Sequence, residues 1–339
     1  DSRFRGNWGA SRCEVVRGVA WAMLVARITQ LYPNAVSAVI VEKFFNIYTK
    51  WNWPQPVLLK PIEDGPLQVR VWNPRLYAHD RQHRMPVITP AYPSMCATHN
   101  ITSSTQKVIL SELERGSEIM AQINSGKSTW ANLFERHDFF HRYKFYLCVV
   151  AATVSTDEEH LKWSGLVKSR LRQLVLKLEV TDGVEIAHPY VKDFSDSYLV
   201  EDHKTEDIIN SYGTLQGETF ISSLKAPTPE DKEKKQIHIT KLFIGLDIKL
   251  KPDGAKKLDI QYPCSEYYSS CKGWTSFNEE IHHIQIKNVK LYDLPNDVYV
   301  EGEARPKKVS KKRKKDVKLD QLKRPKSIAS APVPVDSAN

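Results

Sequence analysis

The pattern of hydrophobic and polar positions predicts helices in the first part of the chain. Residues 19–32 (VAWAMLVARITQLY) are apolar on nearly every face, which is typical of a buried helix. Residues 35–53 predict a second helix, because prolines bound the stretch on both sides. Residues 102–123 predict a third, with Thr102 or Ser103 as its N-cap. The proline-rich, aromatic stretch between the second and third helices predicts an ordered loop packed against them.

The second part of the chain has the pattern of a mixed α/β domain. Residues 157–179 predict a long amphipathic helix, with an apolar stripe on or near Leu161, Leu166, Leu171, Val175 and Leu178. Residues 195–236 are polar and predict an irregular insertion. The predicted strands are 143–153, 184–188, 237–250 and 281–292. This order, with a short helix before the last strand, is that of an α/β sandwich like the RNA-recognition fold.

The fold class that follows is α+β: a helical central domain, an RNA-recognition-like α/β sandwich and a basic tail. We place an unmatched segment at 1–17, the helical domain at 18–136, the sandwich at 137–300 and the tail at 301–339. A length of 339 residues suits two domains and a tail. The tail is rich in Lys, Ser and Pro and is expected to be disordered.

The positive charge is concentrated in that tail. The whole chain carries +9, and residues 305–326 alone carry +10, which leaves −1 on all the other residues. The run KKVSKKRKK at 307–315 therefore predicts a nuclear-import or RNA-contact patch, with a solubilising end as the alternative. A basic face on the long helix (Lys162, Lys168, Arg170, Arg172 and Lys177) is compatible with a phosphate backbone or with simple solvation.

Several other classes of protein are excluded at this level. The longest apolar run, near residues 36–41, is far shorter than the ~20 residues that a bilayer helix needs. No signal-peptide pattern opens the chain, so we expect neither a membrane nor a secreted protein. The five cysteines form no CxxC pair and are expected to be reduced thiols.

Short motifs that suggest chemistry have simpler structural explanations. The sequence NSGKST at 124–129 lacks the first glycine of a phosphate-binding loop, so Gly126 is better explained as a helix C-cap. His137 and His141 have i,i+4 spacing but no third ligand. His282 and His283 are adjacent, so on a strand their rings face opposite sides.

A search for catalytic carboxylates finds none. A two-metal nucleotidyltransferase needs a Gly-Ser turn followed by Asp-x-Asp, and the chain contains no Asp-x-Asp. Its one Gly-Ser, Gly116-Ser117, lies inside a predicted helix. We therefore assign no catalytic and no metal-binding residue.

Three tryptophan- and proline-dense segments carry a family resemblance. VAWAMLVARITQLYPNA, KWNWPQPVLLKPIEDGPLQVRVWNPR and MPVITPAYPSMCATHNIT resemble the eukaryotic nuclear poly(A) polymerases, in detail the budding-yeast type. The match continues through LKWSGLVKSRLRQLVLKLE and YDLPNDVY, from Gly18 to about Asp297. Residues 1–16 do not match, and Arg17-Gly18-Val19 replaces the family's Gly-Gly-Val.

The resemblance implies a template-independent enzyme that adds AMP from ATP to mRNA 3′ ends in the nucleus, using Mg²⁺ or Mn²⁺. Its catalytic aspartates lie in an N-terminal domain that these residues do not match, so we expect residues 1–339 alone to be inactive and to hold no metal. The expected partners are poly(A) primer RNA and subunits of the cleavage and polyadenylation factor; we expect a monomer and no membrane contact. The alternative is a non-catalytic docking module for scaffold subunits of that complex.

The resemblance also implies individual site residues. Gly18 and Val19 match positions that pack on ATP, and Met95, Asn100, Arg172 and Lys290 match RNA contacts. The alternatives from the residues alone are a helix start for Val19, a helix cap for Asn100 and a surface charge for Arg172.

Overall fold

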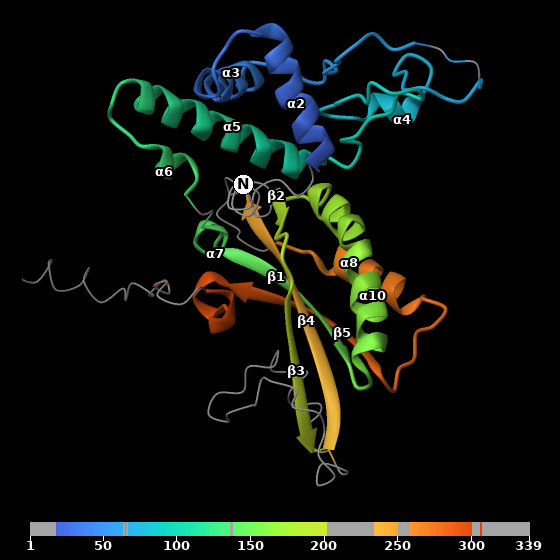
Figure 1. The fold of residues 1–339 in the computed structure, drawn as a ribbon. Coiled ribbons are helices and arrows are strands. Elements are labelled where there is room, and N and C mark those ends of the chain that lie inside the picture. The colour runs from blue at the N-terminus through green and yellow to red at the C-terminus, as the bar shows by residue number, and fades with distance from the viewer. Residues whose placement is uncertain are drawn as a thin grey trace, which may run out of the picture.

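The computed structural model describes residues 18–63, 65, 67–135, 138–201, 234–249, 258–299 and 306. They form a helical domain that sits on one end of a sheet domain (Figure 1). Gly126, interpreted as a helix C-cap, lies within this range, whereas His137 and the Lys-rich run at 307–315 lie outside it. Among the described residues, no helix is both long and apolar enough to cross a bilayer.

Three helices build the helical domain: α2 (Gly18–Leu31), α3 (Ser37–Thr49) and α5 (Ser103–Asn124). Two single-turn helices, α4 (Ala78–Arg81) and α6 (Trp130–Leu133), lie in the connections. The proline-rich loop packs against these helices as predicted, since its Val57, Met85 and Val87 are buried in the same core as Ile28 and Phe45. The predicted second helix was too long at both ends.

Capping interactions define both ends of the helix α5. Thr102 is the N-cap, and Thr102 and Thr105 form a capping box. At the other end Gly126 adopts φ +71°, and the amides of Gly126 and Lys127 bond back to the carbonyls of Ile123 and Gln122. The interpretation of Gly126 as a helix C-cap is therefore confirmed.

Close packing between α3 and α5 depends on Gly116. A Cβ atom added there would lie 2.3 Å from the buried ring of Phe45. The Gly-Ser dipeptide of the sequence thus has a packing role inside a helix and is not a turn.

The sheet domain contains five strands, all paired antiparallel: β1 (Phe145–Thr153), β2 (Val184–Pro189), β3 (Phe194–Glu201), β4 (Lys234–Ile248) and β5 (His282–Lys290). The order is β2-β4-β1-β5, and β3 continues along the edge of β4 that β2 begins. With the helices α8 (Asp157–Glu179) and α10 (Gln261–Lys272), the chain order is β1-α8-β2-β3-β4-α10-β5. Because β2 and β3 share one edge of β4, they count as one strand position, and the order is the β-α-β-β-α-β of the RNA-recognition-like fold. The predicted α+β class is confirmed.

Both faces of this sheet are covered, the second in part. The helices α8 and α10 lie on one face (Figure 1), where Val149 and Leu242 pack against Trp163 and Tyr267. On the other face, Phe139 and Phe140 of α7 (Phe139–Arg142) pack with Leu294, which follows the short turn η3 (Leu291–Asp293), and with Val298 of η4 (Asn296–Val298). Apolar side chains of β1 and β4 such as Val150 and Ile239 are buried on this second face, which also carries the buried Lys241 and the partly exposed His283, Gln285 and Lys287 of β5.

Two details of the predicted sandwich were wrong. Residues 195–201, expected to be irregular, form most of β3, in which Phe194 and Tyr198 pack into the sheet core and Asp196 between them pairs with the buried Lys241. Leu161 is 63% exposed and Leu166 only partly buried, whereas Leu171, Val175 and Leu178 are buried as predicted. The buried stripe of α8 also contains His160, Trp163, Val167 and Leu174.

Buried histidines meet near the start of α8. The His160 ring has Nδ1 3.0 Å from Thr153 Oγ1 and Nε2 2.8 Å from Thr240 Oγ1, and it stacks on His238 at 5.5 Å. Burial lowers the pKa of His160 to about 4, and the neighbouring His238 adds to the effect. Burial also lowers the pKa of His238 and His282, although Asp157 and Glu159 oppose this shift.

These histidines predict acid sensitivity. In the unfolded chain an imidazole takes up a proton near pH 6.5, whereas folded His160 does so only near pH 4. The contribution of neutral His160 to the free energy of unfolding is therefore complete above about pH 6.5. It decreases as the pH drops towards 4, by on the order of 3 kcal/mol in total. Urea unfolding from pH 7.5 to 4.5 checks this, and H160Q is expected to flatten the slope. An unchanged slope in H160Q would exclude this origin.

Candidate functional site

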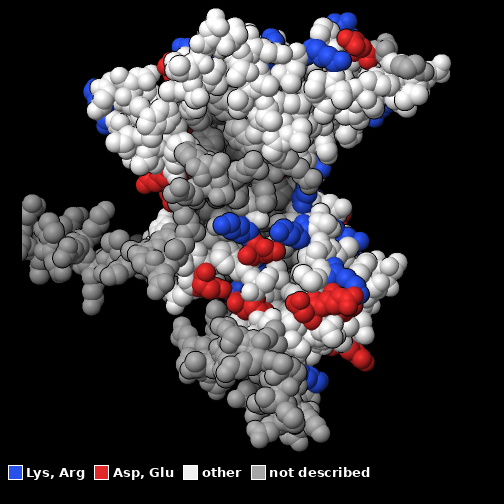
Figure 2. Space-filling model, in the orientation of Figure 1, with Lys and Arg blue, Asp and Glu red and all other residues white. Residues whose placement is uncertain are grey.

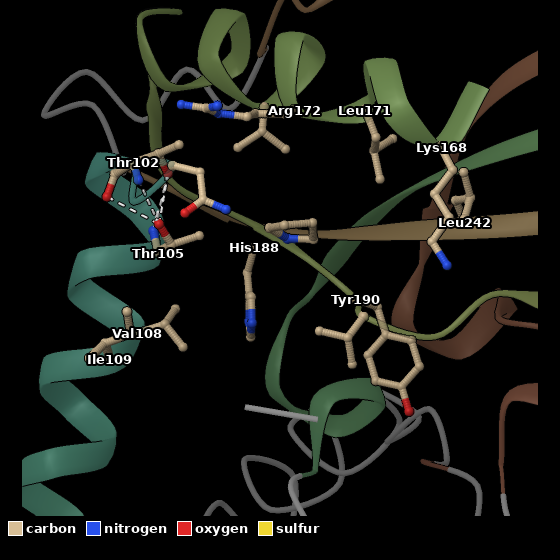
Figure 3. A pocket seen from close by; sticks show the side chains of 14 residues that line it. Thr102, Thr105, Val108, Ile109, Lys168, Leu171, Arg172, His188, Tyr190 and Leu242 are labelled. Atoms are coloured by element: carbon tan, nitrogen blue, oxygen red, sulfur yellow. Dashed lines mark hydrogen bonds between the residues drawn. The ribbon is translucent and has the colours of Figure 1, made fainter. Parts of the chain in front are cut away.

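A cleft with a cavity volume of about 280 Å³ lies where the helical domain meets the sheet domain. Figure 3 shows Val108 and Ile109 projecting from α5 on one side and Leu171 and Arg172 from α8 on the other. Leu242 of β4 and Tyr190, just after β2, line the remaining sides. The polar groups that line it are Asn100, Thr102, Thr105, Lys168, Arg172 and His188. An apolar wall with a few convergent polar groups is the usual form of a ligand site.

Asn100 reaches this cleft because it lies just before the cap of α5. Its neighbours Ile101 and Thr102 are buried, which fixes the backbone on both sides of the turn into the helix. The side-chain oxygen of Asn100 is buried and has no hydrogen-bond partner among the described residues. A buried acceptor without a partner is costly, so this oxygen is suited to accept a hydrogen bond from a ligand. Asn100 does not cap α5, because Thr102 does so.

Arg172 enters the same cleft from α8. Its guanidinium donates a long hydrogen bond of 3.4 Å to the carbonyl of His99 and is otherwise exposed. The family resemblance assigned both Asn100 and Arg172 to RNA binding, but the sequence did not show that the two residues lie close together. The structure brings both to one cleft. Lys168 also lines it, with Nζ 3.3 Å from Asp193.

The other basic side chains of the expected face form ion pairs or hydrogen bonds within the protein. Lys162 pairs with Glu158 and Glu159, Lys177 pairs with Glu266, and Arg170 donates to the carbonyl of Ser270. Figure 2 shows positive and negative side chains interspersed over the sheet domain on this side, with no single basic patch. Only the part of α8 that faces the helical domain therefore offers positive charge towards the cleft.

The other predicted residues lie outside the cleft lining. Gly18 and Val19 start α2, where Val19 is 66% exposed. Met95 is 41% exposed on a loop held by paired hydrogen bonds with Thr89. Lys290 is exposed at the end of β5, opposite Phe145 of β1.

The covered sheet restricts where a ligand can bind. RNA-recognition folds stack bases on aromatic side chains of an open sheet face. Here that face lies under α7 and residues 291–299, and Lys241 of β4, which is fully buried, forms ion pairs with Asp297 of this segment and with Asp196. Base stacking on the part of this face that these residues cover is therefore blocked in the described structure.

A possible metal cluster in the proline-rich loop is structural. His79, Asp80 and His83 approach within 4.8 Å of one another. However, Asp80 accepts hydrogen bonds from Arg70 and from the backbone of residue 73, and the Trp72 indole donates to His83 Nδ1. That bond puts the proton of neutral His83 on Nε2, where a metal would need a lone pair.

The prediction that the rings of His282 and His283 face opposite sides of a strand is confirmed, since the first is buried and the second partly exposed.

A second concave region was not predicted. A groove of about 860 Å³ runs between α10 and β5, lined by Ser265, Tyr268, Ser269 and Gln285 among others. In the described part of the chain β5 pairs only with β1, so it is a sheet edge. The sequence patterns gave no strand order, and an edge could not be recognised without it.

Comparison with known families agrees with this two-part architecture. A model of the poly(A) polymerase central domain matches residues 10–136, and a model of the poly(A) polymerase predicted RNA binding domain matches residues 138–308. The chain belongs to the poly(A) polymerase family. The resemblance inferred from the sequence is thereby confirmed, and the central-domain match begins within the segment that had been left unassigned.

Similar proteins carry the same family name. Poly(A) polymerase PAPalpha of Candida albicans is 69% identical over 318 residues, which cover 93% of this chain and 57% of that protein. Poly(A) polymerase pla1 of Schizosaccharomyces pombe is 49% identical over 91% of this chain and 58% of its own length. A poly(A) polymerase of Dictyostelium discoideum is 37% identical over 87% of this chain and 33% of its own. The chain thus spans less than 60% of the length of these relatives.

Proposed function

We propose that this chain forms the primer-holding part of a nuclear poly(A) polymerase, which adds AMP from ATP to the 3′ end of mRNA without a template. The observation that carries the proposal is the convergence of Asn100 and Arg172 in one partly apolar cleft between the two domains. The partly covered sheet face supports it, because α7 and residues 291–299 lie on the usual base-stacking surface of the fold. Both proposed contacts lie in the folded body.

The cleft offers the chemistry that RNA binding requires. The free oxygen of Asn100 accepts a hydrogen bond from the exocyclic amine of an adenine, and the Arg172 guanidinium binds a phosphate. Apolar side chains such as Val108 and Leu171 contact the face of the base. The partners proposed here are therefore a poly(A) primer and, for the assembled enzyme, ATP.

The ATP side of the proposal uses the start of α2. Val19 presents an exposed apolar side chain there, and a Cβ on Gly18 would meet no atom within 4 Å. These two residues are proposed to pack against the incoming nucleotide, and Met95 and Lys290 to contact RNA outside the cleft. Nuclear entry is proposed to use the Lys-rich run at 307–315.

The divalent metal of the reaction does not fit these residues. The sequence has no Asp-x-Asp, and in the described cluster the Asp80 carboxylate and His83 Nδ1 already accept hydrogen bonds from protein donors. We therefore derive no catalytic step here and propose that residues 1–339 alone do not extend a primer. Extension of oligo(A) by this polypeptide with ATP and Mg²⁺ or Mn²⁺ would overturn this part of the proposal.

Substitutions in the cleft test the primer site. Asn100→Ala and Arg172→Ala are each expected to weaken oligo(A) binding about tenfold, since each removes one direct contact. Arg172→Ala should also reduce the dependence of binding on salt by about one phosphate contact, whereas Asn100→Ala should not. Fluorescence anisotropy of labelled oligo(A) across a salt series measures both. The control Lys162→Ala, on the same helix but paired with glutamates, should bind like the parent; equal binding by all variants would place RNA elsewhere.

A second function, docking, is favoured by the groove beside β5. An edge strand offers free backbone groups to an extended segment, and α10 provides a wall for its side chains. The occupant we propose is an extended segment of a scaffold subunit of the cleavage and polyadenylation factor. Binding of this kind depends on backbone pairing and apolar contact and therefore resists salt.

Filling this groove tests docking separately from RNA binding. Ser269→Tyr places a ring in the groove and is expected to weaken capture of purified scaffold subunits at least tenfold in high salt, with oligo(A) binding unchanged. Ser169→Tyr, at an exposed serine of α8 outside the groove, is the matched control. Equal capture by both variants would contradict the groove as the docking site.

A further inference from the structure

One carboxylate joins the two domains at the edge of the cleft. Glu179 is the last residue of α8, and its side chain meets the first turn of α5. Its Oε1 accepts hydrogen bonds from the Thr102 hydroxyl at 2.5 Å and the Ser104 amide at 2.7 Å, and its Oε2 accepts one from the Ser103 amide at 3.2 Å. A side chain of the sheet domain thus satisfies amides at the start of a helix in the other domain.

The charge and shape of a carboxylate suit this position. The first amides of a helix lack partners within the helix, and the helix dipole favours a negative charge there. The Thr102 hydroxyl accepts a hydrogen bond from the Thr105 amide while donating to Glu179, so the N-cap and the domain contact share one atom. An amide side chain would point its NH₂ group at a backbone N–H where Oε2 now accepts, and it would lose the charge.

Other contacts cross the joint as well. The Ala187 amide donates to Ser104 Oγ at 2.9 Å, and Arg142 of α7 lies 3.7 Å from the Glu112 carboxylate of α5. Lys107 lies 3.6 Å from the Glu185 carboxylate, but both groups of this pair are more than 40% exposed, and such pairs contribute little. At the first turn of α5, beside Asn100, Glu179 accepts three hydrogen bonds with a single carboxylate.

The two proposed RNA contacts lie close to this joint on rigid elements. Asn100 precedes the N-cap of α5 by two residues, and Arg172 precedes Glu179 by about two turns of α8, or roughly 10 Å along its axis. A shift of α8 against α5 would therefore separate Asn100 from Arg172 and widen the cleft between them.

We propose that Glu179 is a positioning residue for RNA binding: by holding the end of α8 on the start of α5, it sets the distance between Asn100 and Arg172. Glu179 does not touch RNA in this proposal and acts through the two residues that do. The inference rests on the proposed primer site in the cleft.

A double-mutant cycle tests this role. Glu179→Gln is expected to weaken oligo(A) binding about tenfold in the full chain, and Arg172→Ala is expected to add little in the Glu179→Gln background. The reason is that Arg172 no longer reaches the same RNA as Asn100 once the joint has shifted, so the effects do not add. Glu179→Asp keeps the charge but shortens the reach, and it should give an intermediate loss if Glu179→Gln does not fold. Glu185→Gln, at the exposed pair across the same joint, is the control and should bind like the parent.

Each outcome decides a separate claim. If Asn100→Ala and Arg172→Ala leave oligo(A) affinity unchanged, the primer site itself is wrong. If those two weaken binding but Glu179→Gln does not, the positioning role is wrong. Equal and fully additive losses from Glu179→Gln and Arg172→Ala would also overturn it, because a residue that acts through Arg172 cannot be independent of it.

Discussion

The hydrogen bonds from the first turn of α5 to Glu179 are the interaction on which the relation between the two domains depends. Each domain has its own apolar core, one around α2, α3 and α5 and two on the faces of the sheet. Between them lie the hydrogen bonds of Glu179, and the cleft remains open beside these bonds. Directional hydrogen bonds can fix the relative orientation of two domains even where the surrounding surfaces are not in contact. The cleft between the domains can therefore stay open. The geometry of the proposed primer site is therefore a property of the joint and of neither domain alone.

The covering of both sheet faces, one of them in part, explains why the remaining surfaces take different roles. With α8 and α10 on one face and α7 and residues 291–299 on part of the other, much of the sheet is covered. The end that meets α5 carries the cleft, and the β5 edge carries the groove beside α10. The buried Lys241, with its ion pairs to Asp196 and Asp297, helps to hold the covering segment in place. An RNA-recognition-like order of strands is thus retained while part of its usual binding face has become core.

The sequence predicted most of the helices and strands but few of the contacts between them. The helix at 157–179 and the cap at Thr102 follow from local periodicity and capping chemistry, and the structure confirms both. The strand at 194–201 was missed because its inward positions are separated by polar ones and a polar insertion follows. The basic face of α8 was visible, but its pairing with glutamates and carbonyls was not. Glu179 gave no local signal, since its partners lie more than 70 residues earlier in the chain. Contacts of that kind depend on tertiary packing, which a single sequence does not reveal.

The central claim is that RNA binds to the folded body, in the cleft between the domains, and not only to the Lys-rich tail. The most direct test compares the affinity of labelled oligo(A) for residues 1–339 and for residues 1–300 across a salt series. The account predicts that residues 1–300 retain binding, with a shallower dependence on salt because the tail's phosphate contacts are gone. Loss of binding together with the tail would contradict it, and would leave the body as a docking module.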